Sequence, residues 1–435
     1  MSGLPVQAMI LATACLTLLA CFDKPADVDF DAGPRDAAVL DARRPDAGVC
    51  VPDTIVCDDA SGHYIECSSA GTVTVDVACV VGCAPTEEKC LDVDPSNGVG
   101  PYLDMAANGD DVLVAQGTTW TVDTNDGTIL AGTQPVTLDQ AEFSGMRVLI
   151  VKSLDLRGTV KVTGTEPLVI VSDGDVKITG ILDVSADAGT AGPGALEAGA
   201  CLGAETSTAG AGGAGHYEVG GAGGASGESG GAGGAAARDD DASPLVGGCR
   251  GGCVGCIDSP LCGNCSHGGA GGGAVQIVSR TEIAVTGGGK IDAGGGGGRS
   301  GSNVATCARS GGGGGSGGTI LLEAPTTTID GTGSVVAARG GGGAATGNGS
   351  APNQGHDGDT LQPAAAGGDN LSCANGGAGG TESLPPVAGV SGGGGGGGAS
   401  GQVRINNRSG IVAPSNGAAI RARHTVGLVG TRISP

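Results

Sequence analysis

The segments VQIVSRTEIAVTGGGKIDA (residues 275–293), TILLEAPTTTIDGTGSVVAA (319–338) and QVRINNRSGIVAPSNGAAIRA (402–422) share one pattern. Each contains short runs in which apolar, mostly β-branched residues alternate with other residues, and glycine-containing turns separate the runs. Such runs are typical of β-strands and are poor helix formers. Segments 148–164 and 168–184 repeat the pattern earlier in the chain. The repeated unit is about twenty residues long, which suits one turn of a parallel β-helix.

A glycine-rich tract precedes each of the three quoted segments. The tracts cover residues 186–273, 294–318 and 340–401, and 70 of the 91 glycines lie between positions 186 and 401. The tracts are therefore insertions at one fixed point of the repeating unit. Two structures remain open for them. They are flexible loops, because glycine has the most backbone entropy to lose, or polyglycine-II strands that hydrogen-bond side by side.

The fold class that these features predict is all-β. We expect residues 95–435 to form a parallel β-helix or solenoid that carries the glycine-rich insertions on one side. The composition agrees, because one Trp, three Tyr and three Phe leave only a narrow aliphatic core. The alternative is a β-sandwich, in which short strands also recur. A sandwich rarely tolerates large insertions at the same point of every unit.

The N-terminus predicts export. Residues 1–20 contain an apolar stretch too short to span a bilayer, which is typical of a signal peptide. The stretch ends in Leu18-Leu19-Ala20-Cys21, which resembles the lipobox of bacterial lipoproteins. That resemblance implies a lipid-modified Cys21 as the first residue of the mature chain. The alternative is a chance cysteine after an ordinary signal peptide, and the lack of Lys or Arg in residues 1–7 departs from the usual pattern.

Residues 21–49 predict an acidic tether. Asp-Ala pairs recur there every five residues, starting at positions 31, 36, 41 and 46, with prolines between them. Such a segment has too little apolar surface to fold, and its charges favour extension. The formal net charge of the whole chain is −23. Acidity of this degree disfavours nucleic-acid binding. It also repels anionic lipid surfaces, so the expected membrane contact is the lipid anchor alone.

Residues 50–90 predict a small module held by three disulfides. Six cysteines in about forty residues are typical of exported domains with little core. They are Cys50, Cys57, Cys67, Cys79, Cys83 and Cys90. Fifteen pairings are open, and the sequence does not choose between them.

Eight further cysteines lie in the glycine-rich tracts, and disulfides are again expected. They are Cys201, Cys249, Cys253, Cys256, Cys262, Cys265, Cys307 and Cys373. A zinc site is the alternative, because Cys253 and Cys256, and likewise Cys262 and Cys265, have CxxC spacing. Only five residues separate the two pairs, however, which is shorter than in zinc ribbons.

No catalytic site is assigned. Parallel β-helices include polysaccharide lyases and hydrolases, whose sites use clustered carboxylates with basic residues. The candidates are Asp155, Asp175 and Asp183 with Arg157, Lys161 and Lys177. Their spacing suits surface charge pairs equally well. No cofactor is predicted, and Ca²⁺ is the one metal that the acidic composition favours.

The whole layout resembles a group of glycine-rich predicted outer-membrane lipoproteins of the myxobacterial kind. The matching features are the lipobox, the Asp-Ala tether, the six-cysteine module, Pro95-Ser96-Asn97-Gly98 and the glycine-rich tracts. The resemblance implies a bacterial outer-membrane or cell-surface location and no established activity. The periplasm or secretion is the alternative location.

The function expected is structural or adhesive and non-enzymatic, with a surface glycan or a protein as ligand. A carbohydrate-active β-helix enzyme is the first alternative. Binding of divalent cations or ice through regular outward Thr and Asp is the second.

We predict that Cys21→Ala abolishes lipid attachment and releases the protein from the membrane, because the thiol is the site of modification. Palmitate labelling and fractionation of cells check this, with the wild-type chain as control. Labelling that persists in the variant contradicts the lipobox assignment.

Overall fold

The computed structural model describes residues 50–433, apart from 59–61, 85–88, 188, 238–239, 256–265, 301–309, 348–352, 361–363, 371–373 and 382–383. The predicted signal peptide, Cys21 and the tether lie outside these residues. The described chain is nearly all-β with a curled parallel sheet, so the all-β prediction is confirmed. Its two helices are short: η1 (Ser96–Gly98) and α1 (Gly100–Ala106).

The N-terminal module is a small antiparallel unit with three disulfides. Strands β1 (Ile55–Asp58), β2 (His63–Cys67) and β3 (Val73–Ala78) form one sheet. Strand β5 (Lys89–Val93) pairs with β4 (Cys83–Ala84) on one side and with the C-terminal β25 (Thr431–Ile433) on the other. The disulfides are Cys50–Cys67, Cys57–Cys83 and Cys79–Cys90. The prediction of a disulfide-bonded module is confirmed, and the structure supplies the pairing that the sequence left open.

The curl of the parallel sheet begins at one long strand, β11 (Met146–Leu156). Its first half pairs with β13 (Leu168–Ser172) and its second half with β14 (Val176–Ile178). Two stacks therefore start from β11. The first continues through β16 (Ala274–Ser279), β19 (Thr319–Glu323), β22 (Gln402–Asn407) and β24 (Arg423–Leu428). The second continues through β17 (Glu282–Val285) and β20 (Thr326–Ile329), while β6 (Asp110–Val114) and β10 (Asp139–Phe143) also pair with β11.

A separate sheet supplies a third stack of parallel strands. Its order is β7 (Thr119–Asp123), β12 (Thr159–Thr163), β15 (Ile181–Asp183), β18 (Lys290–Asp292), β21 (Val335–Ala337) and β23 (Ala419–Arg421). Strands β8 (Ile129–Ala131) and β9 (Gln134–Pro135) extend its first end in antiparallel fashion. Parallel pairing between successive repeats is not the arrangement of a β-sandwich, whose sheets are antiparallel.

The core is a set of aliphatic rows that run through the stacks. In one row, equivalent positions of successive strands are paired in register and buried, namely Leu149, Ile170, Ile277, Leu322 and Ile405. Burial of each such side chain contributes about 1.5–3 kcal/mol. The residues between these positions are buried as well, and Val169 and Leu321, for example, pack in a second apolar cluster.

A buried carboxylate joins the repeats to the segment that precedes them. Glu323 is fully buried on β19 and accepts hydrogen bonds from the Ser96 backbone and hydroxyl, from the Gln276 amide at 2.7 Å and from the Asn406 amide at 3.0 Å. A buried charge is tolerated only when its hydrogen bonds are made in this way. Ser96 belongs to the Pro95–Gly98 motif, which thus fixes the entrance of the chain to the sheet.

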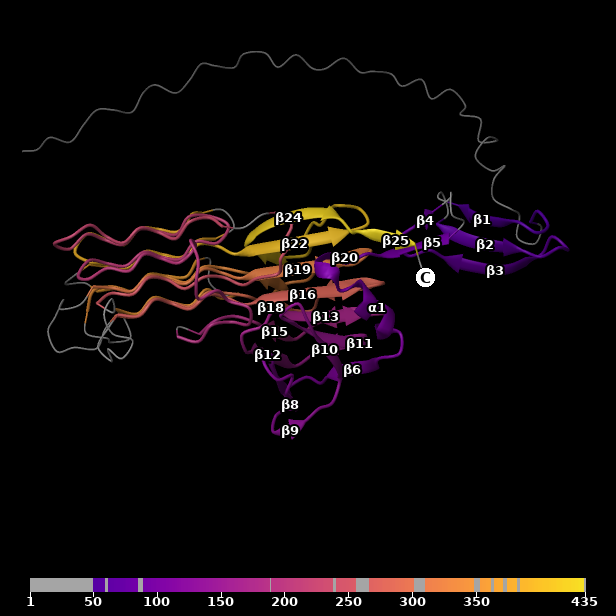
Figure 1. Ribbon diagram of the computed structural model, residues 1–435, viewed down its shortest axis with the longest axis horizontal. Helices are drawn as coiled ribbons and strands as arrows, with labels where there is room; N and C mark the ends of the chain where they lie inside the picture. The colour runs from indigo at the N-terminus through magenta and orange to yellow at the C-terminus, as the bar shows by residue number, and fades with distance from the viewer. Residues whose placement is uncertain are drawn as a thin grey trace, which may run out of the picture.

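The module is attached to the sheet by an ion-pair network. Arg280 lies 3.1 Å from Asp92 and 2.6 Å from Asp173, and it also pairs with Asp104. Arg432 on β25 pairs with the same Asp92 and Asp104. The network fixes the module at one end of the molecule. Figure 1 shows the module, with β1 to β5 and β25, at the opposite end from the extended glycine-rich strands.

Candidate functional site

The glycine-rich tracts form an ordered bundle. Their described parts are extended strands that form a separate lobe past one end of the sheets, on the left of Figure 1. Several strands continue directly into the sheet: 268–273 leads into β16, 311–318 into β19 and 393–401 into β22. Of the two structures open at the sequence level, hydrogen-bonded extended strands are the one present in the described residues.

The hydrogen bonds of strand 210–215 repeat every three residues. Three successive amides donate to three different neighbouring strands; the pairs are Gly212 to Ala204 at 3.0 Å, Gly213 to Gly221 at 2.8 Å and Ala214 to Gly314 at 2.9 Å. Its carbonyls accept from three more strands; the donors are Gly252 to Gly212, Gly234 to Gly213 and Ala399 to Ala214. Strand 210–215 thus has six neighbours. Three residues per turn with bonds in all directions is the polyglycine-II arrangement.

Close packing explains why the central strands are pure glycine. Residues 311–315, 340–343 and 393–398 are glycine runs, and each of these strands also bonds to six others. A Cβ atom added at Gly313 would lie 1.9 Å from the Gly212 carbonyl oxygen, and one at Gly397 would lie 1.9 Å from the Ala378 carbonyl oxygen. These contacts are with backbone, which cannot move aside. Any side chain in these strands would separate the bundle.

The outer strands instead carry a residue with a side chain at every third position. Strands 220–225 and 230–235 both read Gly-Gly-Ala-Gly-Gly-Ala. Ala222, Ala225, Ala232 and Ala235 are all exposed. The glycines between them contact backbone; a Cβ at Gly223, for example, would lie 1.9 Å from the Gly210 oxygen. The period alone does not place a strand at the surface, because strand 210–215 has it too and buries Ala211 and Ala214 completely.

A carboxylate organises the turns at the far end of the bundle. Glu228 accepts hydrogen bonds from three successive amides, those of Ser207 at 3.0 Å, Thr208 at 2.7 Å and Ala209 at 3.0 Å. The bond from the Thr208 amide is the main cause that lowers the pKa of the Glu228 carboxyl. Turns 206–209 and 226–229 are thereby held together at the tip.

The cysteines of the first tract are used in two ways. Cys201 and Cys249 form a disulfide, as predicted. Cys253 was also predicted to be disulfide-bonded, but it is a free, buried cysteine whose Sγ accepts from the Arg250 guanidinium at 2.6 Å. The remaining five predicted disulfide cysteines lie outside the described residues. They are Cys256, Cys262, Cys265, Cys307 and Cys373.

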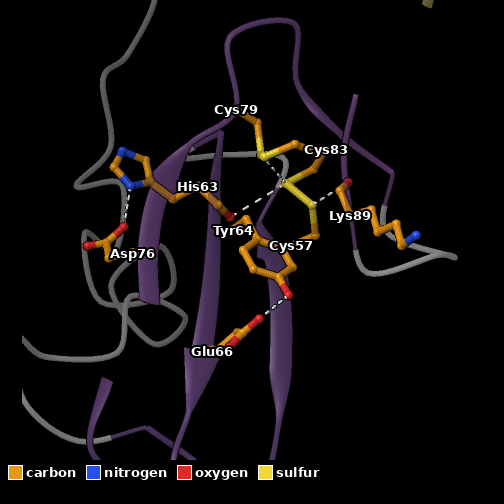
Figure 2. Close-up of a disulfide and its surroundings, with 9 residues drawn as sticks. Cys57, His63, Tyr64, Glu66, Asp76, Cys79, Cys83 and Lys89 are labelled. Atoms are coloured by element: carbon orange, nitrogen blue, oxygen red, sulfur yellow. Dashed lines mark hydrogen bonds and ion pairs between the residues drawn. A yellow bond between two sulfur atoms is a disulfide. The ribbon is translucent and has the colours of Figure 1, made fainter. Parts of the chain in front are cut away.

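Figure 2 shows the sulfur cluster of the N-terminal module, where Cys79 lies against the Cys57–Cys83 disulfide. Within the described residues, Cys57, Cys79 and Cys83 are the only group of potential metal-binding side chains that lie close enough together. All three are in disulfides and so lack the thiolate that a metal needs. Tyr64 donates to Glu66 on the same strand, β2, and His63 on β2 pairs with Asp76 on the neighbouring β3.

The structure places the catalytic candidates in adjacent surface ion pairs. The nitrogen–oxygen distances are 2.5 Å for Arg157–Asp155, 3.1 Å for Lys177–Asp175 and 3.6 Å for Lys161–Asp183. The pKa of Asp175 is lowered, first by the hydrogen bond from the Thr281 hydroxyl and then by Lys177. A lowered pKa makes this carboxyl unsuitable as a general acid. The outward row Asp155, Lys177, Ala284 and Thr328 mixes charges and is not a regular Thr or Asp array.

A cleft of about 520 Å³ lies where the chain passes between the sheet and the bundle. Its lining includes Asn97, Met146, Thr165, Pro167 and Leu245, and no charged or aromatic side chain contributes to it. The cleft therefore lacks the paired carboxylates and the aromatic platform of a polysaccharide-cleaving site.

One acidic group lies at the junction of sheet and bundle. Asp292 on β18 is paired in register with Asp183 on β15, and its carboxylate accepts from the Gly294 amide at 2.9 Å. Burial is the main cause that raises the pKa of Asp292 to about 7, and the charges of Asp183 and Asp359 raise it further. Asp292 thus holds a proton under conditions in which ordinary carboxyls are ionised.

No helix in the described part of the chain is long and apolar enough to cross a membrane. Neither a protein-family model, a curated protein nor a solved structure matches this chain.

We predict that Gly313→Ala disrupts the bundle, because the new methyl group would overlap the Gly212 carbonyl. The expected cost is about 3 kcal/mol or more, as for other overpacked sites. Hydrogen exchange of the bundle amides measures the effect, and Ala222→Val is the matched control because position 222 points to solvent. Equal protection in both variants would show that the lattice packing is wrong.

We predict that stability falls as the pH rises from about 4 to about 7, through Asp292. In the folded state Asp292 keeps its proton up to a pKa of about 7, whereas the unfolded carboxyl releases its proton near 3.8. Between these two values a rise in pH therefore lowers the free energy of the unfolded state relative to the folded state. Thermal unfolding between about pH 5 and about pH 8 measures the slope. Asp292→Asn should flatten it, and an unchanged slope in this variant contradicts the assignment.

Proposed function

We propose that the protein is a lipid-anchored, non-enzymatic surface protein with a structural or adhesive role, and that the glycine-rich bundle is the part it displays. The observation that carries the proposal is the placement of the two ends. The described chain starts at Cys50 in the disulfide module, and the bundle projects from the opposite end of the sheet (Figure 1). A tether that joins the module would hold the bundle away from the membrane.

The curled parallel sheet is, in this proposal, a β-solenoid of the parallel β-helix type. Three stacks of in-register parallel strands around one aliphatic core support it. A solenoid is a suitable carrier, because each of its turns contacts only its neighbours and can bear an insertion without disturbing the rest. The glycine-rich tracts enter and leave at equivalent points of successive units.

We also propose that the chain is a member of the glycine-rich outer-membrane lipoproteins that it resembles. The three disulfides support an oxidising compartment, because such bonds persist outside the cytosol. The lipobox with Cys21 and the acidic tether support the anchor. Bacterial outer membrane or cell surface is the location that follows, and a surface glycan or a protein is the proposed ligand.

The competing proposal, a carbohydrate-active enzyme, has less support. Its candidate carboxylates are used in exposed ion pairs, and the cleft beside the bundle carries no charge. Specificity of an adhesive surface, in contrast, needs only a rigid shape, which the hydrogen-bonded bundle provides.

We predict that intact cells expose the wild-type protein to a membrane-impermeant biotin reagent, and that the purified mature chain releases no unsaturated or reducing ends from acidic polysaccharides. We expect this because the proposal places the bundle at the cell surface, and because the candidate carboxylates among the described residues lie in exposed ion pairs. Turnover that is lost on Asp175→Ala would establish the enzyme instead. Protein that is labelled only after cell lysis would contradict surface display.

A further inference from the structure

One outer layer of the bundle consists of three strands, 220–225, 230–235 and 386–391. The middle strand bonds to both of the others, through Gly220 to Gly234 at 2.9 Å and Gly389 to Ala222 at 2.8 Å. It also lies on two strands of the next layer, through Gly221 to Gly397 at 2.9 Å and Gly213 to Gly221 at 2.8 Å. The three strands therefore lie side by side in a single flat layer.

The outward positions of this layer are small and exposed. Gly223 faces the layer below, and the preceding Ala222 is exposed. On strand 386–391, Gly389 faces the same layer below, so the preceding Ala388, also exposed, projects with Ala222. Residues three apart point the same way. The outward set is Ala222, Ala225, Ala232, Ala235, Ala388 and Ser391.

Larger apolar side chains border the same layer. Leu384, Val387 and Val390 are spaced three residues apart along its edge and are 62%, 53% and 52% exposed. Val219, at the start of the middle strand, is 58% exposed. We call the outward set together with these four residues the apolar face. Adjoining exposed apolar residues occur at interaction sites and also on ordinary monomers, so the charge of the face decides its assignment.

The apolar face is uncharged although the chain carries a net charge of −23. Strands 220–225, 230–235 and 384–391 contain no Asp, Glu, Lys or Arg. Other outer strands of the bundle do carry charges; these are Glu197, Glu205, Arg250, Arg299, Asp357 and Asp369. Two copies of so acidic a protein can therefore approach each other with least repulsion at this face.

We infer that the apolar face binds the same face of a second copy of this chain, so that displayed bundles associate with one another. The inference rests on the proposed function, because it names the partner of the displayed surface. The face is suited to self-association. Its backbone is fixed by hydrogen bonds, and alanine loses almost no side-chain entropy on burial. Rows of methyl groups alternate with glycines along each strand, so two such faces fit together.

The size of the face sets the strength of the contact. Six residues at about 3.1 Å each and three strands about 4.8 Å apart give about 270 Å². A stable dimer in solution needs about 800 Å² on each partner. A single contact is thus weak, and many anchored copies on opposed surfaces would associate through multivalency.

The test uses beads that carry the mature chain through a biotin at its N-terminus, where the lipid would be. We expect wild-type beads to aggregate while the free protein stays monomeric in sedimentation. Beads that carry Ala222→Asp with Ala232→Asp should stay dispersed, because the paired faces then bury like charges. Ala366→Asp is the matched control, since Ala366 is an exposed alanine on another strand of the bundle.

Dispersed wild-type beads overturn the inference, and so does aggregation that the double variant retains. Circular dichroism of each variant shows whether the bundle remains folded, and Ala222→Ser with Ala232→Ser, which adds no charge, should aggregate as the wild type does. Surface labelling of intact cells tests the proposed function separately. A displayed chain on beads that do not aggregate would leave the proposed function standing and reject this partner.

Discussion

The close approach of backbone to backbone is the constraint on which the bundle depends. In the central strands an added Cβ atom would overlap a carbonyl oxygen of a neighbouring strand. At Gly398 its distance to the Gly315 oxygen would be 2.0 Å, which is too short for a non-bonded contact. The amides of such a strand donate to three neighbouring strands, and its carbonyls accept from three others. This differs from a β-sheet, in which a strand bonds to two neighbours only. Glycine in this bundle is therefore a packing requirement and not a sign of flexibility.

The sheet and the bundle share one spacing. Neighbouring strands of a sheet lie about 4.8 Å apart, and successive repeats deliver their chains to the bundle at that interval. Strand 268–273 bonds to strand 311–316 through Gly272 and Ser316 at 2.9 Å, and their continuations β16 and β19 pair in register. The aliphatic rows of the core thus determine which glycine strands become neighbours.

The sequence predicts the sheet better than the bundle. The apolar residues at 275–278 and 320–322 identify buried strands. Alternation does not assign their faces, because Gln276 and Leu321 between the inward positions are also fully buried. The disulfide module is also predictable, since its cysteine density leaves little choice. The pairing is not, because it depends on how β1 to β5 cross in space. The spacing of Asp175 and Lys177 suits a surface charge pair as well as a catalytic pair, and the structure shows the surface pair.

The glycine pattern predicts the position of a strand in the bundle only in part. Unbroken glycine at 311–315 lies inside, but the Gly-Gly-Ala period of the outer strand 220–225 also occurs at 210–215, which lies inside. Which strands become neighbours could not be predicted, because glycine has no side chain to specify a partner. Only the connections to the sheet and the turns supply that information.

Entropy explains why the bundle needs the sheet. Ordering each residue costs about 1–2 kcal/mol, and glycine costs most, while a backbone hydrogen bond returns only about 0.5–1.5 kcal/mol. The bundle buries few large side chains, so it has little else to offset this cost. Strands 311–318 and 393–401 are held because they continue into β19 and β22. Strands 210–215, 220–225 and 230–235 make the longest excursion without entering the sheet, and the Cys201–Cys249 disulfide closes that excursion. The one described disulfide of the bundle is thus placed where the sheet restrains the chain least.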